Sequence, residues 1–147
     1  VETGHMHLSL PGELRRALNG QGRVRTRFLL GAVARQRARH PRIFGPGDEL
    51  TFAHLFRRSL TAEAEKLLAA RSLIYIKLLS KDEIPAAASP TPHLDEEIRL
   101  SALMCQLSYA QCEALYPQLK QAAPQQAGEL VAAFLKNPGP GGQSESK

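Results

Sequence analysis

The chain has 147 residues, which is enough for one domain with a sizeable apolar core but too short for two domains of ordinary size. Its 43% hydrophobic and 22% charged residues are typical of a globular domain and exclude a wholly disordered chain. No apolar run approaches the roughly 18 residues of a membrane-spanning helix, and two cysteines exclude a disulfide-rich scaffold.

The two ends of the chain look separate from the folded part. Residues 1–6 contain a Gly-His-Met run that is typical of a cloning remnant. Residues 138–147 are rich in Pro and Gly, cannot continue a helix and are expected to form a flexible tail. We therefore expect a single helical domain over residues 7–137, cut from a larger protein or complex.

Charge divides this expected domain into two halves. Residues 1–81 contain 15 Lys or Arg and 6 Asp or Glu, a net charge of +9, whereas the remaining residues contain 4 and 8, a net charge of −4. The sequence thus predicts a basic half over residues 7–81, a Pro- and Ala-rich linker over residues 82–92 and an acidic half over residues 93–137.

The basic half owes its charge to a block of arginines. Between Leu14 and Gly47 there are nine positive residues, none of them Lys, and no acid. They are Arg15, Arg16, Arg23, Arg25, Arg27, Arg35, Arg37, Arg39 and Arg42. The planar guanidinium suits carboxylates and phosphates, so the block predicts attraction to an acidic protein face, to nucleic acid or to an anionic membrane surface. The plainer alternative is a solvated helix face.

The first two predicted helices lie in this block. Ser9 is a candidate N-cap for a helix that runs to Leu18 and stops at two residues that favour positive φ, Asn19 and Gly20. A second helix is predicted over residues 23–39, where apolar residues recur at intervals of four and define one face. That face comprises Val24, Phe28 and Ala32, and the His-Pro pair that follows ends the helix.

The middle of the chain allows two interpretations. Ile43 and Phe44 stand in a Pro- and Gly-flanked loop, where bulky apolar residues either plug a core or offer a contact surface. Residues 51–80 form either one bent helix or two helices, the second beginning at Thr61. The apolar run at residues 73–76 is assigned to a buried helix, because no second β-branched run could pair with it as a strand.

The acidic half predicts one long helix and one short helix. Thr91 and Pro92 are a favourable helix start, and Asp95, Glu96 and Glu97 would complement the helix dipole in its first turn. The stripe Leu94, Ile98, Ala102, Cys105, Tyr109, Cys112 and Tyr116 repeats at helical spacing and predicts the buried face. A last helix is expected over residues 125–135. The fold class is therefore all-α, an antiparallel helical bundle or a short α-solenoid of about five to seven helices.

Patterns that mark catalysis are missing from the sequence. No phosphate-binding loop, zinc-protease helix or nucleophile elbow is present. Cys105 and Cys112 would lie about 10 Å apart along one helix, too far for a disulfide or a shared zinc, so buried structural thiols in a reducing compartment are expected. We expect no enzymatic activity, no cofactor and no metal, and an intracellular location in the nucleus or cytoplasm.

The sequence thus predicts a non-catalytic interaction domain, a scaffold or adaptor that presents an Arg-rich face to an acidic partner or accepts a partner helix in a groove. The candidate contact residues are Arg15, Arg16, Arg23, Arg25, Arg27, Arg35, Arg39, Arg42, Ile43 and Phe44. The alternative is a helical domain that binds the phosphate backbone of DNA or RNA electrostatically. A third possibility is self-association, with the acidic half of one copy meeting the basic half of another.

Overall fold

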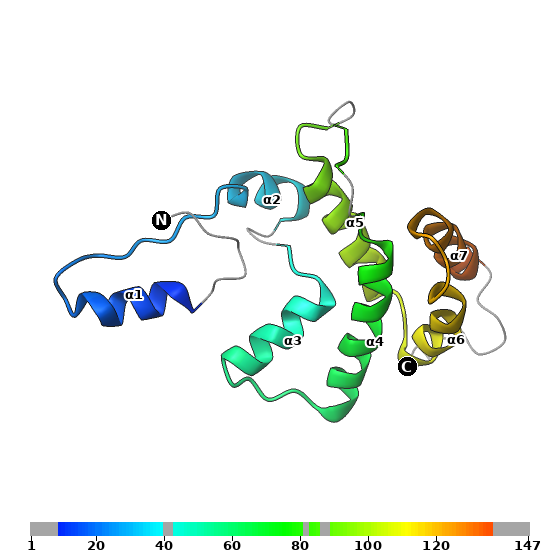
Figure 1. Ribbon diagram of the computed structural model, residues 1–147, viewed down its shortest axis with the longest axis horizontal. Helices are drawn as coiled ribbons and strands as arrows, with labels where there is room; N and C mark the ends of the chain where they lie inside the picture. The colour runs from blue at the N-terminus through cyan, green and yellow to red at the C-terminus, as the bar shows by residue number, and fades with distance from the viewer. Residues whose placement is uncertain (1–8, 40–42, 81–82, 86–88, 137–147) are drawn as a thin grey trace. The chain divides into compact units, whose positions relative to one another are not determined.

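The computed structural model describes most of the chain in four stretches, residues 9–39, 43–80, 83–85 and 89–136. The predicted cloning remnant and the predicted tail lie outside these residues. Seven helices and no strand occur within the described stretches, which confirms the all-α fold class (Figure 1). The chain divides into two compact units, residues 1–43 and residues 44–147.

The first unit contains two short helices. Helix α1 spans Leu10–Leu18 and ends, as predicted, where Asn19 and Gly20 adopt positive φ of 40° and 81°. Ser9 occupies the N-cap position, as predicted, and its carbonyl accepts a hydrogen bond from the Glu13 N–H at 3.0 Å, but its backbone is helical and its side chain makes no capping hydrogen bond. No residue of α1 is buried, so this helix contributes surface rather than core.

The second predicted helix is only half right. Helix α2 spans Gly31–Ala38, whereas residues 23–28 have no regular secondary structure. In a helix Arg23 and Arg27 would lie one turn apart and repel each other, and the β-branched Val24 and Thr26 further disfavour a helix. The expected apolar face of residues 24, 28 and 32 therefore does not form on one helix.

The second unit is a helical bundle. Its helices are α3 (Pro46–Leu55), α4 (Ala62–Leu78), α5 (Pro92–Cys105), α6 (Tyr109–Leu119) and α7 (Pro124–Lys136). Helix α4 packs against each of the other four, and α6 also packs against α7 (Figure 1). The buried cluster draws on four helices and their connections and comprises Ile74, Leu78, Leu100, Met104, Leu107, Cys112, Leu115, Leu119, Ala122, Ala127 and Val131.

Residues 51–80 form two helices, which decides between the two interpretations of the sequence. Helix α3 begins earlier than expected, at Pro46, and the carboxylate of Asp48 accepts a hydrogen bond from the Gly45 N–H at 2.9 Å. Helix α4 begins where predicted, and the Thr61 hydroxyl accepts a hydrogen bond from the Ala64 N–H at 3.2 Å. The apolar run at residues 73–76 is helical, as expected.

A glycine brings α3 close to the central helix. An added Cβ at Gly47 would lie 2.7 Å from the Ser72 hydroxyl oxygen, so only glycine allows this approach without a shift. The loop before α3 is held by the Ser101 hydroxyl, which donates a hydrogen bond to the Phe44 carbonyl at 3.3 Å. These contacts fix α3 on α4.

The single long helix predicted in the acidic half is wrong. The chain breaks between α5 and α6, where Ser108 and Gln111 form a reciprocal capping box and start a new helix. The predicted stripe is consequently not one buried face, and its members Ala102, Cys105 and Tyr109 are exposed. The expectation of two buried thiols holds for one cysteine only, the one at position 112.

The last helix is confirmed, since α7 covers the predicted residues 125–135 and buries Val131 in the bundle. No helix within the described stretches is long and apolar enough to cross a membrane.

Candidate interaction surface

The arginine block lies on the surface of the first unit. Eight of its nine members fall within the described residues, and all eight are exposed. They are Arg15, Arg16, Arg23, Arg25, Arg27, Arg35, Arg37 and Arg39. The ninth, Arg42, lies outside the described residues. Exposure leaves each of these guanidinium groups accessible to a partner in solution.

Most of this charge has no counterpart in the part of the chain that the structure describes. Arg16 pairs with Glu13 one turn earlier on α1. Six other arginines form no ion pair with a described carboxylate, and these are Arg15, Arg23, Arg25, Arg27, Arg35 and Arg39. Their potentials add because no acid lies between them along the chain.

Three kinds of backbone carry the arginines. One group lies on α1, one on the irregular residues 23–28, and one on α2 and its C-terminal end. Arg23 and Arg27 therefore do not share a helix with Arg35, as the helix predicted over residues 23–39 required. Arg39 ends α2 with a left-handed backbone, φ 57°, where a cation complements the negative end of the helix dipole.

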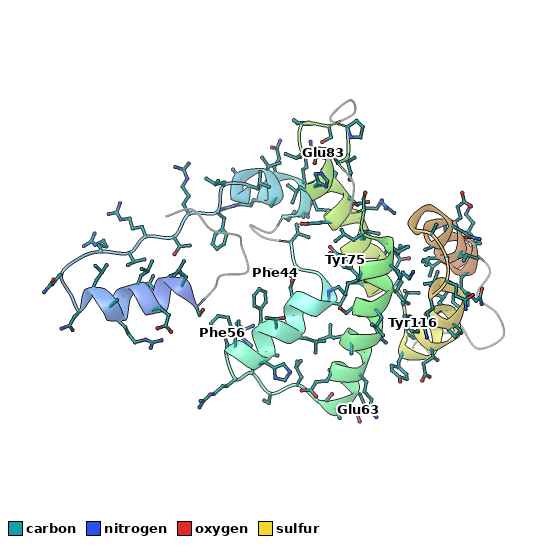
Figure 2. The ribbon with its side chains drawn as sticks, in the orientation of Figure 1. Phe44, Phe56, Glu63, Tyr75, Glu83 and Tyr116 are labelled. Carbon is teal, nitrogen blue, oxygen red and sulfur yellow. The ribbon has the colours of Figure 1, made fainter. Side chains whose placement is uncertain are left out.

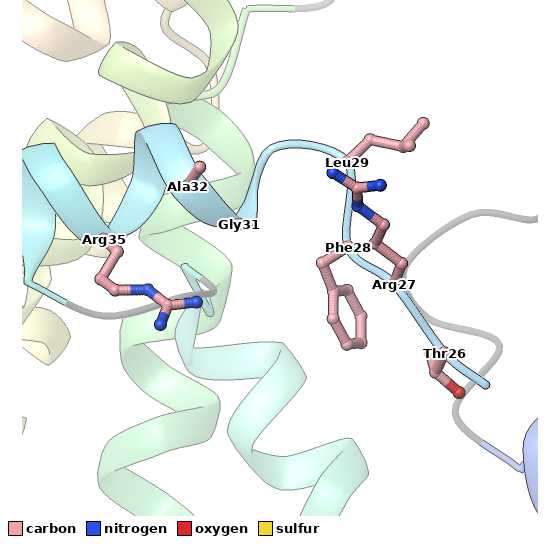
Figure 3. Close-up of a pocket in the computed structure, with 7 residues that line it drawn as sticks. All are labelled: Thr26, Arg27, Phe28, Leu29, Gly31, Ala32 and Arg35. Carbon is pink, nitrogen blue, oxygen red and sulfur yellow. The ribbon is translucent and has the colours of Figure 1, made fainter.

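A pocket of about 370 Å³ brings two of the predicted residues together within the first unit. Arg27 enters it from the irregular segment and Arg35 from α2, as Figure 3 shows. The remaining lining comes from Thr26, Phe28, Leu29, Gly31 and Ala32. The pocket thus places cationic groups beside an apolar wall, a combination that suits an anionic group attached to an apolar one.

Ile43 and Phe44 are each half-buried, so neither is the fully buried plug that would rule out a contact role. The Phe44 ring meets the Phe52 ring edge-on, with centroids 4.4 Å apart, and so anchors the start of α3. Ile43 and Phe44 also fall on opposite sides of the division between the two units.

Sequence reasoning missed a group of apolar residues at the end of α3. Phe52 is half-buried, whereas Leu55 and Phe56 are 51% and 53% exposed. The rings of Phe52 and Phe56 lie one turn apart, with centroids separated by 6.3 Å. The signal in the sequence is the spacing of Phe52 and Phe56, four residues apart with Leu55 beside them, which places three apolar side chains near one another at the end of a helix.

Three titratable side chains of the second unit are accounted for by hydrogen bonds or by burial. Asp95 accepts a hydrogen bond from the Ser89 hydroxyl, and Glu96 accepts one from the Ser80 N–H at 3.3 Å. Burial raises the pKa of the Cys112 thiol and so disfavours its reactive thiolate. Among the described residues, no group of three or more His, Cys, Asp and Glu side chains is arranged to hold a metal ion.

Comparison of the chain with protein-family models, with curated proteins and with solved structures gave no match.

Proposed function

We propose that this protein is a non-catalytic interaction module of the scaffold or adaptor type, whose first unit binds an acidic protein partner through its arginines. One observation carries the proposal: six exposed arginines within residues 15–39 form no ion pair with any described carboxylate. Such a charge density is costly in isolation and favourable beside an anionic surface, because neutralisation by the partner relieves the mutual repulsion.

The identity of the charged residues favours carboxylates as the target. Arginine binds a carboxylate through two parallel hydrogen bonds and sheds its hydration more readily than lysine. The block contains arginine alone. The pocket lined by Arg27, Arg35 and Phe28 places an apolar surface beside the cations. This combination suits a peptide, which carries apolar and acidic side chains together, better than it suits a phosphate backbone.

A second candidate function, electrostatic binding of a nucleic-acid backbone, is favoured by one observation. Arg23, Arg25 and Arg27 alternate along a segment without regular structure, and basic segments of this kind are able to follow successive phosphates. We rank it second because aromatic side chains for base stacking are sparse in the sequence and no Asn- or Gln-rich recognition helix accompanies the arginines.

The test compares two anionic probes by fluorescence anisotropy, a labelled polyglutamate peptide and a labelled oligonucleotide, single-stranded and duplex. Each is titrated with the full chain at about 50 and 200 mM salt, since phosphate contacts lose affinity steeply over this range. The variant R23Q/R25Q/R27Q removes three charges from the irregular segment. A matched control, K66Q/K120Q/K136Q, removes three exposed charges from the second unit.

We expect polyglutamate binding that weakens at least about tenfold in the arginine variant and changes little in the lysine control. If both variants lost polyglutamate affinity equally, binding would depend only on the net charge of the protein, and the proposal would be overturned. Oligonucleotide binding that is tighter than polyglutamate binding and depends on the same three arginines would favour the second candidate.

A further inference from the structure

The C-terminal half of helix α3, in the second unit, carries apolar side chains that solvent reaches. We define the α3 surface as Phe52, Leu55 and Phe56. Phe56 follows the last residue of α3 and Phe44 precedes its first, as Figure 2 shows. Leu55 and Phe56 keep about half of their surface in contact with solvent, 51% and 53% respectively.

The rings of this surface form a continuous row. The ring centroids of Phe52 and Phe56 are 6.3 Å apart, and the Phe52 ring also meets the ring of Phe44 edge-on, with centroids 4.4 Å apart. Rigid aromatic anchors bind a partner with a small loss of side-chain entropy, which is why they recur in the contact centres of interfaces.

Cations border the row at the C-terminal end of α3. Arg57 and Arg58 follow Phe56 directly, are exposed, and form no ion pair with a described carboxylate. His54 is also exposed on the last turn of the helix. The one exposed acid of α3, Glu49, lies nearer to its N-terminal end. A ligand of this surface therefore meets positive charge beside Phe56.

The backbone at Arg57 and Arg58 is held by two hydrogen bonds. The Arg58 N–H donates to the Ala53 carbonyl at 2.9 Å, and the Arg57 N–H donates to the His54 carbonyl at 3.3 Å. This is the Schellman arrangement, and its left-handed residue, usually glycine, is here Arg57 with φ 49°. The left-handed backbone costs a non-glycine residue about 1 kcal/mol or more. An arginine at this position despite that cost is consistent with a role of its side chain in binding.

We propose that the α3 surface is a docking site for an acidic amphipathic helix of another protein. The apolar side chains of that helix lie against Leu55 and Phe56, and its carboxylates face Arg57 and Arg58. A second copy of this chain fits less well, because twofold packing through the same face would bring the arginines of both copies together. The site lies in the second unit and does not depend on the arginines of the first.

The probe is a labelled helical peptide of about 18 residues, with leucines spaced to form one face and glutamates at the remaining positions. A companion peptide carries lysine in place of every glutamate. Both are titrated by fluorescence anisotropy against the full chain and against two variants, F56S, which removes an anchor, and R58E, which reverses a border charge without altering the apolar row.

The matched control for the anchor is I76S. Ile76 is 57% exposed on α4, so this substitution removes an apolar side chain of similar exposure from outside the α3 surface. Far-ultraviolet circular dichroism and thermal melts establish that each variant is folded. The variant R23Q/R25Q/R27Q separates this site from the arginines of the first unit.

We expect the acidic peptide to bind with micromolar affinity and to lose at least about tenfold in F56S and in R58E. It should bind I76S as it binds the unaltered chain, and the lysine peptide should bind at least about tenfold more weakly. Binding unchanged in R58E, equal binding of the two peptides, or no saturable binding below about 1 mM would each overturn the docking site.

A loss confined to R23Q/R25Q/R27Q would also overturn the α3 site while leaving the proposed function of the first unit intact. A loss confined to F56S and R58E would support the α3 site even if the polyglutamate test of the first unit fails.

Discussion

The two units of the molecule differ in how many of their side chains are buried. The first unit places arginines on short helices and on irregular backbone, and its helix α1 buries no residue. The second unit buries eleven residues in one cluster around α4. Stability is therefore expected to come from the second unit and electrostatic attraction from the first.

The sharpest test compares a leucine of the cluster with a leucine of α1. Leu119 has no exposed surface, so L119A should lower the free energy of unfolding by about 3 kcal/mol through lost burial and the cavity left behind. Leu18 is 38% exposed, and L18A should cost about 0.5 kcal/mol. Urea denaturation followed by circular dichroism measures both. Similar losses in the two variants would show that α1 is as tightly packed as the bundle.

Arginine also has a structural use in the second unit. The half-buried Arg71 donates to the Leu107 carbonyl at 2.8 Å and to the Cys105 carbonyl at 3.0 Å, and so satisfies backbone acceptors where α5 ends. R71A should lower the free energy of unfolding by about 1 to 2 kcal/mol. R99A, which removes an exposed cation from α5, is the control and should change it by less than about 0.5 kcal/mol. Equal effects would contradict a bonding role for Arg71.

The stability of the second unit is expected to fall at alkaline pH, because of Tyr75 on α4. Burial, with a smaller contribution from the charge of Glu97, raises the pKa of Tyr75 from 10.0 to about 12. Below pH 10 the hydroxyl is neutral in both states, so it adds no pH dependence. Between pH 10 and about 12 it ionises first in the unfolded chain, so stability falls as pH rises.

Y75F should remove this part of the decline, worth about 1 kcal/mol after allowance for the solvent that reaches the half-buried ring. The measurement is urea denaturation of both proteins at several values between pH 9 and 12. Parallel stability curves for Y75F and the unaltered chain would show that Tyr75 does not titrate differently on folding.

The sequence predicted the fold class and most helix positions, because caps such as Thr61 and stop signals such as Asn19 act locally. It did not use the Ser108 cap, however, because the apolar period continued through it, and so joined α5 to α6. It also extended α2 across residues 23–28, where repulsion between arginines outweighs periodicity. The sequence could not predict that Leu55 and Phe56 are exposed, since the burial of a side chain depends on which helices pack together.

The smallest expected effect distinguishes stability from binding at one residue. R57G relieves the left-handed backbone at the end of α3, where φ is 49°, and should raise the free energy of unfolding by about 0.5 to 1 kcal/mol. Lost interaction of the cation with the helix dipole offsets part of this gain. The same variant should bind the acidic helical peptide more weakly, because it removes a cation beside Phe56.

Arg39 offers the matched control. R39G relieves a similar backbone, φ 57°, at the end of α2 and should leave peptide binding at the α3 surface unchanged. A gain in stability in both variants, with a loss of binding in R57G alone, would show that the strain at Arg57 is tolerated for the sake of its side chain. A loss of stability in R57G would show instead that the arginine is there for the fold.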